Sequence, residues 1–133
     1  MTQVIYVLGN PLLREDSLPL KLLPKLRERF RDVAFKELDP SENLPEEEHL
    51  VIVDTIINCN NVCVLKDIDK IATEPRYSLH DFDLGFSLKL MKKLGKINDV
   101  TIIGVPQMIR LENALEQTVK IIASLLSESA RRS

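Results

Sequence analysis

The sequence lacks the features that mark several large classes of protein. It contains no apolar run of about 18 residues or more, the length that a membrane-spanning helix needs. It does not open with a basic segment followed by an apolar stretch and a cleavage site. Its formal net charge is only -2 and its pI is about 5.7, so it lacks the basic character of a general nucleic-acid binder. We therefore expect a soluble, cytoplasmic protein with no nucleic-acid partner and no membrane insertion.

Cysteine is scarce, and its spacing does not match a redox or zinc motif. Cys59 and Cys63 are separated by Asn-Asn-Val rather than by two residues, and no second pair is present to complete a zinc site. We expect two reduced thiols without a chemical role. The chain also lacks Gly-x-Gly-x-x-Gly and the Lys-Ser/Thr phosphate loop, the glycine-rich motifs that cradle nucleotides.

What the sequence does contain is the composition of a globular domain. Of its 133 residues, 44% are hydrophobic and 29% are charged, which is typical of neither fibrous nor disordered chains. A chain of this length buries a sizeable core but is short for two ordinary domains. We therefore predict one domain that spans residues 1–133.

Short apolar runs alternate with amphipathic helical patterns along the chain. Runs typical of buried strands lie at residues 4–8, 33–38, 50–53, 62–65 and 100–105. Helices are predicted over residues 18–30, 78–94 and 111–126. This alternation predicts an α/β fold, a single domain with a mainly parallel twisted sheet of about five strands and helices on both faces.

Several local features of the helices are also predicted. Ser17 is expected to cap the first helix, and Pro24 is expected to kink or divide it. Gly95 is expected to close the second helix, and residues 127–133 are expected to fray. The second helix is expected to face the core with a stripe of Leu79, Phe82, Phe86, Leu90 and Leu94, widened by Leu84, Leu88 and Met91.

Three residues with metal-binding side chains lie at junctions between the predicted strands and helices. Asp16 lies in the loop after the first strand, Asp54 at the end of the third, and His80 at a helix start. In a parallel sheet these points meet at one edge, where ligands are usually held. Two carboxylates and one imidazole are typical of an open divalent-metal site, and the donors alone allow zinc, nickel, iron or manganese. Structural roles as helix-end, turn or core residues also remain open for all three.

The segments around these residues follow three recognisable patterns. Residues 9–16 are Gly-Asn-Pro-Leu-Leu-Arg-Glu-Asp, residues 51–54 are a short apolar run ending in Asp, and residues 78–80 are Ser-Leu-His. Together they resemble the Gly-Asn-x-Leu-x-x-acid-acid, strand-Asp and Ser/Thr-x-His motifs of the hydrogenase maturation endopeptidases. The motifs follow the order of that family over almost the whole chain.

The resemblance implies an endopeptidase that removes the C-terminal extension of a nickel-iron hydrogenase large-subunit precursor after nickel insertion. It implies that Asp16, Asp54 and His80 are the catalytic and nickel-binding residues, with nickel supplied by the substrate. Glu15 would lie beside them, and Asp39 resembles a further acid of the family. Because the chain offers no convincing serine or cysteine nucleophile, metal-directed hydrolysis is preferred over an acyl-enzyme.

The sequence also departs from the family pattern at several points. Leu8 and Ser17 replace residues that are commonly glycine, and Asp39 is followed by Pro40 and an acidic stretch instead of a glycine-rich loop. The connection at residues 106–110 is a shortened version of the family's. We expect these changes to affect substrate specificity more than metal binding, because all three metal donors are present.

Two noncatalytic alternatives remain open. A binding module of this fold would hold a nucleotide or phosphate at the same sheet edge, although Glu15 and Asp16 would repel phosphate. A maturation chaperone would recognise a metallated precursor without cutting it. Basic helix faces available for such a partner are formed by Lys21, Lys25, Arg27 and Arg29, and by Lys89, Lys92 and Lys93.

Overall fold

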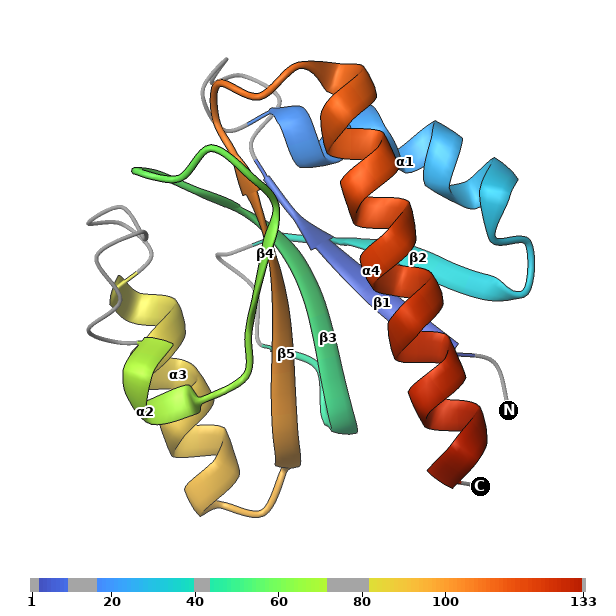
Figure 1. Ribbon diagram of the computed structural model, residues 1–133. Coiled ribbons are helices and arrows are strands. Elements are labelled where there is room, and N and C mark those ends of the chain that lie inside the picture. Colours follow the sequence, from blue (N-terminus) through green and yellow to red (C-terminus); the bar gives the residue numbers. More distant parts are fainter. Residues whose placement is uncertain (1–2, 10–16, 40–43, 72–81, 133) are drawn as a thin grey trace.

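A five-stranded sheet with helices on both faces is the framework of the molecule (Figure 1). The computed structural model describes residues 3–9, 17–39, 44–71 and 82–132. The elements in chain order are β1 (Gln3–Leu8), α1 (Leu18–Arg29), β2 (Val33–Leu38), β3 (Glu47–Ile56), β4 (Cys63–Leu65), α2 (Ile68–Ile71), α3 (Phe82–Lys93), β5 (Ile97–Pro106) and α4 (Leu111–Arg132).

The sheet has the strand order β2-β1-β3-β5-β4, and β4 is its one antiparallel member. The predicted α/β class and mainly parallel five-stranded sheet are therefore confirmed. After β1 the chain adds β2 on one side, and it then crosses to place β3 on the other side. The strand order thus reverses between β1 and β3, and the carboxyl ends of these two strands flank a topological switch point.

Two apolar cores fill the space between the sheet and its helices. Alternate side chains of each central strand point to opposite faces, so Val53 joins one core and Ile52 the other. The first core lies under α1 and α4, where Leu22, Leu26 and Ile122 are fully buried. The second lies under α2 and α3 and includes Leu88. Figure 1 shows these two helical layers on either side of the sheet.

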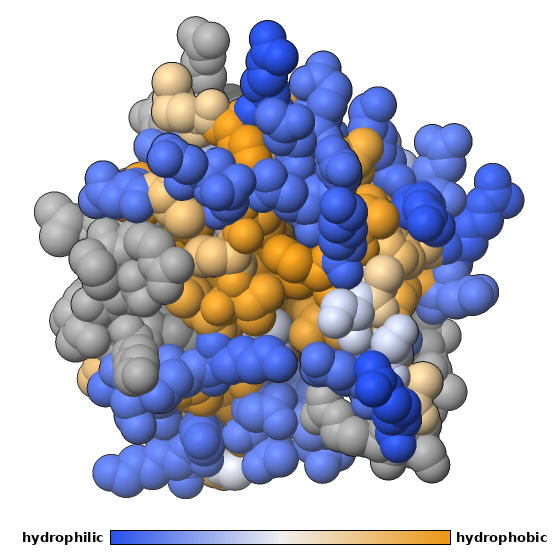
Figure 2. Space-filling view, viewed as in Figure 1, coloured by the Kyte–Doolittle hydropathy of each residue, from blue (hydrophilic) through white to orange (hydrophobic). Residues whose placement is uncertain are grey.

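β4 forms a short edge of the sheet. It contains three residues, pairs only with β5, and leaves the Val64 side chain 37% exposed. Figure 2 has the same view as Figure 1, and it shows apolar surface in the centre of the molecule, at the place where β4 lies in Figure 1. A strand this short limits the row of backbone groups open to edge-to-edge pairing.

The apolar stripe predicted for the 78–94 helix is wrong for the described part of α3. Phe86, Leu90 and Leu94 are 64%, 47% and 60% exposed, while Leu88 is fully buried. Leu84 and Met91, predicted only to widen the stripe, pack against the core beside Leu88. The segment carries apolar residues on two opposite faces, so periodicity did not identify the face that packs on the sheet. Leu79 lies outside the described residues.

The structure confirms or corrects the other helix predictions. Gly95 has a φ of +75° and follows the end of α3, where Lys96 N–H donates to Met91 O at 2.9 Å, so the predicted helix stop is confirmed. Pro24 does not divide α1, because it lies on the exposed side, where water can hydrate the carbonyl that loses its donor. Ser17 occupies the N-cap position but makes no side-chain capping hydrogen bond, since its backbone is helical.

The C-terminal end of the closing helix, α4, also differs from the prediction. Residues 127–132 continue α4 and do not fray, and Lys66 Nζ lies 3.7 Å from Glu128 Oε2 on this last stretch.

The short helix α2 was not predicted, since four residues carry too little periodicity to reveal it. No helix in the described ranges has both the length and the apolar character needed to cross a bilayer.

Candidate active site

Asp54 lies near the carboxyl end of β3, next to the topological switch point. The register pairs Val53 with Val7 of β1 and Asp54 with Gly104 of β5. The prediction that the third strand ends at Asp54 is corrected, because Thr55 and Ile56 still pair with Val105 and Pro106. The carboxylate therefore belongs to a rigid, doubly flanked strand rather than to a loop.

The Asp54 side chain is almost completely buried. It is 2% exposed, and its Oδ1 accepts a hydrogen bond from the Thr55 backbone N–H at 2.7 Å. By strand alternation it shares a face with Ile52 and Ile56, the face that α2 and α3 cover. A carboxylate in such apolar surroundings is costly unless hydrogen bonds or a cation stabilise its charge.

Gly104 allows close packing beside Asp54. A Cβ atom at this glycine would lie 2.6 Å from Ile56 Cγ2, closer than side-chain atoms approach one another. The Ile56 side chain therefore packs against the backbone of β5 at the position paired with Asp54. Sequence reasoning missed this role of Gly104, and the signal available was a lone glycine inside an otherwise apolar strand.

Asp16, His80 and Glu15 lie outside the described residues, so their predicted proximity to Asp54 stays a prediction. The flanking elements are described. α1 begins at Leu18, two residues after Asp16, and α3 begins at Phe82, two residues after His80. Figure 1 shows α3 antiparallel to β5, so the first turn of α3 lies nearer the carboxyl edge of the sheet than its last turn. α3 also packs on the face that carries Asp54.

Asp39 is exposed and directly follows β2 at the same edge of the sheet. β1 lies between β2 and β3, so two interstrand spacings, roughly 10 Å, separate the strand of Asp39 from that of Asp54. The structure thus places Asp39 on the rim of the edge and Asp54 inside it.

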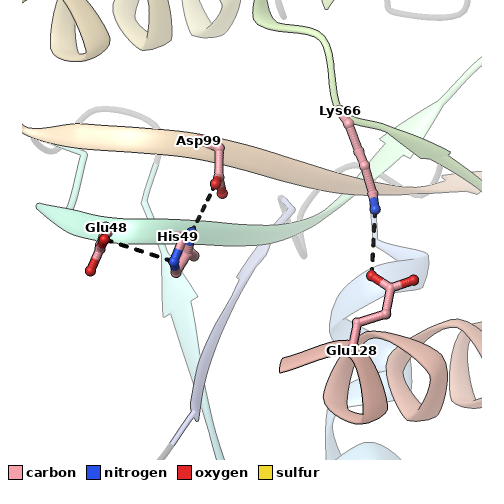
Figure 3. Close-up of polar contacts among 5 residues, drawn as sticks. All are labelled: Glu48, His49, Lys66, Asp99 and Glu128. Atoms are coloured by element: carbon pink, nitrogen blue, oxygen red, sulfur yellow. Dashed lines mark hydrogen bonds and ion pairs between the residues drawn. The ribbon is translucent and has the colours of Figure 1, made fainter. Parts of the chain in front are cut away.

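The other histidine of the chain, His49, belongs to a separate polar cluster at the opposite edge of the sheet. His49 and Asp99 are register partners near the amino ends of β3 and β5, and His49 Nδ1 lies 2.8 Å from Asp99 Oδ2 (Figure 3). His49 Nε2 is 4.0 Å from Glu48 Oε1. About half of each side chain of the His49–Asp99 pair is exposed. The pair joins two strands and is remote from the carboxyl edge.

Tyr6 is a titratable residue whose surroundings shift its pKa. Its hydroxyl donates to Glu47 Oε1 at 2.8 Å, and the residue is 8% exposed. Burial first, and then the hydrogen bond and negative charge of Glu47, raise the pKa of Tyr6 from 10.0 to about 12. This phenol therefore stays neutral at physiological pH and links β1 to the start of β3.

Neither the cysteines nor any other described group forms a metal cluster. Cys59 and Cys63 are not joined by a disulfide, and the Cys59 thiol donates to Asn61 O at 3.1 Å. Among the residues that the structure describes, no three His, Cys, Asp or Glu side chains are grouped as metal ligands. Two of the three predicted ligands, Asp16 and His80, are outside that set.

The fold is shared with solved structures of endopeptidases. The solution structure of an endopeptidase from Escherichia coli matches with a TM-score of 0.58 and 20% identity, covering 99% of this chain and 93% of the other. The hydrogenase 2 maturation peptidase of a Thaumarchaeota archaeon matches with a TM-score of 0.57 and 19% identity, covering 94% and 98%. An uncharacterised protein from Wolinella succinogenes matches with a TM-score of 0.60 and 11% identity over 100% of both chains.

These similarities establish a common fold at low sequence identity. No protein-family model matches the sequence, and no curated protein is significantly similar to it.

Proposed function

We propose that this protein is a cytoplasmic endopeptidase that removes the C-terminal extension from the large-subunit precursor of a nickel-iron hydrogenase. Asp16, Asp54 and His80 recognise the nickel ion that the precursor carries, and the scissile bond lies beside that ion. The observation that carries the proposal is the placement of Asp54. Its buried carboxyl lies at the carboxyl edge, beside the switch point, in a fold shared with a hydrogenase maturation peptidase.

The three motifs of the sequence support the same site. The segment with Asp16 follows β1, and the segment with His80 precedes α3, so both are attached to elements that border the face or edge of Asp54. An ion held there polarises the scissile carbonyl or activates a water molecule. Asp54, or Glu15 beside Asp16, is then available to accept the proton of that water. No serine or cysteine nucleophile is needed in this scheme.

The proposal is tested by incubating the purified protein with nickel-loaded and metal-free forms of the large-subunit precursor. Intact-protein mass spectrometry measures release of the C-terminal extension. We expect release only from the nickel-loaded precursor, because the metal in the substrate is the recognition signal. Stable binding of the nickel-loaded precursor without release would instead establish the chaperone alternative, and equal cleavage of both forms would exclude nickel recognition.

A further inference from the structure

The outer face of α3 carries an exposed apolar stripe. Phe86, Leu90 and Leu94 follow one another at four-residue intervals and are 64%, 47% and 60% exposed, while Leu88 on the opposite face is fully buried. Residues at this spacing lie on one side of a helix and form a continuous strip. Single exposed apolar side chains are common on protein surfaces, but contiguous ones mark sites of interaction.

Lysines accompany this stripe along its length. Lysines occupy positions 89, 92, 93 and 96, and the one acidic residue in the sequence of α3 is Asp83 in its first turn. Lys89 follows Phe86 by three residues and Lys93 follows Leu90 by three, which places both beside the stripe. Lys93 has no ion pair with any described residue, and Lys89 has only a 4.0 Å contact with the exposed Asp69. A complementary partner therefore has an apolar centre and an acidic rim.

The charge pattern argues against the two other occupants of such a face. A symmetric dimer through α3 would bring the lysines of two copies into one interface, with only Asp83 of each α3 as an acidic residue to offset them. On an anionic membrane, the lipid headgroups would attract the lysines but repel the exposed Asp67 and Asp69 beside α3. A protein partner with acidic side chains around an apolar patch fits both the stripe and its lysines.

The stripe also has a defined relation to the proposed site. α3 packs its inner face against the core that Asp54 borders, and its first turn is the end nearer the carboxyl edge. A partner lying along the outer face is thus held beside that edge. We propose that Phe86, Leu90 and Leu94, with Lys89 and Lys93, form the docking surface for the folded body of the precursor, through an apolar patch with an acidic rim on it. This inference rests on the proposed function.

The test compares the double variant Phe86→Ser/Leu90→Ser with the wild type in tail release from the nickel-loaded precursor. We expect KM to rise by about tenfold or more with kcat unchanged, because the substitutions remove binding surface and leave the catalytic residues intact. Lys93→Glu should raise KM in the same direction. Val64→Thr on β4, another exposed apolar position, is the matched control and should keep the wild-type KM. Urea unfolding should give the same midpoint for the stripe variants and the wild type.

A parallel pull-down of the nickel-loaded precursor separates this inference from the proposed function. Normal tail release by the double variant at the wild-type KM would overturn the docking surface and leave the peptidase intact. Stripe-dependent binding without tail release would support the docking surface and overturn the peptidase, and absence of both would overturn both. A wild-type dimer in light scattering that the double variant abolishes, or stripe-dependent cosedimentation with phosphatidylglycerol vesicles, would assign the face to those partners instead.

Discussion

Gly104 lies directly against Ile56: a Cβ atom at the glycine would stand 2.6 Å from Ile56 Cγ2 and 3.0 Å from its Cδ1. Gly104 is also the register partner of Asp54. The absence of a side chain at position 104 therefore allows the buried isoleucine to pack beside the buried carboxylate. This close packing leaves little freedom to the strand that carries Asp54.

Substituting Gly104 tests this contact. Gly104→Ala should lower the free energy of unfolding by about 1–3 kcal/mol, because the added methyl group overpacks a fully buried site. Urea unfolding gives the measurement. In an Ile56→Ala background, Gly104→Ala should lower the free energy of unfolding by a smaller amount, since the clashing Ile56 atoms are absent. Equal costs in the two backgrounds would show that Ile56 is not the obstacle.

At Gly95, in contrast, the loss of stability on substitution comes from the backbone conformation alone. Its φ is +75°, and a Cβ atom there would meet no atom within 4 Å. Gly95→Ala should therefore destabilise the protein by about 1 kcal/mol through backbone strain, and Gly95→Asn by less. Thermal or urea unfolding distinguishes the two variants. An alanine variant as stable as the wild type would contradict the left-handed conformation at the end of α3.

The tyrosine titration is directly observable, because the chain has two tyrosines and no tryptophan. In a Tyr77→Phe variant the remaining phenol, Tyr6, should ionise with a pKa of about 12, since burial and Glu47 disfavour its anion. Ultraviolet difference absorbance of tyrosinate follows this ionisation. Glu47→Gln should lower the Tyr6 pKa toward 10.0. Ionisation near 10.0 with Glu47 intact would contradict the buried hydrogen bond.

The same shift predicts how stability depends on alkaline pH. The pKa of Tyr6 is higher in the folded state, about 12, than its ordinary value of 10.0. Its contribution to stability is thus fully present below pH 10 and is lost as the pH rises through about 12. Comparing wild-type and Tyr6→Phe unfolding free energies between these pH values isolates the effect. A Tyr6→Phe variant with the wild-type loss of stability across this interval would refute it.

The sheet was predictable because each strand contains a short apolar run and turn signals separate these runs. The sequence pattern located all five strands, but it started the third at Leu50 although β3 begins at Glu47. That first stretch is polar and partly exposed, and backbone pairing of Glu47 and His49 with β5 holds it in the sheet. Pairing between distant segments leaves no periodic signal in either of them.

The exposed face of α3 was not predictable for a different reason. Its residues include two apolar rows, one with Leu84 and Leu88 and the other with Phe86 and Leu90. Hydrophobicity does not say which row packs on the sheet and which faces water, and the structure buries the first. For Asp54, the alternation of elements predicted a place near the carboxyl end of the third strand, where the structure has it, whereas its burial and its contact with Thr55 required the fold.

The chain itself supplies matched controls for the proposed site. His49 and Asp99 repeat the side-chain types of His80 and Asp54 at the opposite edge of the sheet. The decisive measurement is mass spectrometry of tail release from the nickel-loaded precursor by Asp16→Asn, Asp54→Asn and His80→Ala, compared with His49→Ala and Asp99→Asn. We predict that each of the first three variants loses release while remaining folded, and that both controls retain it. Wild-type release by any of the first three would contradict the site.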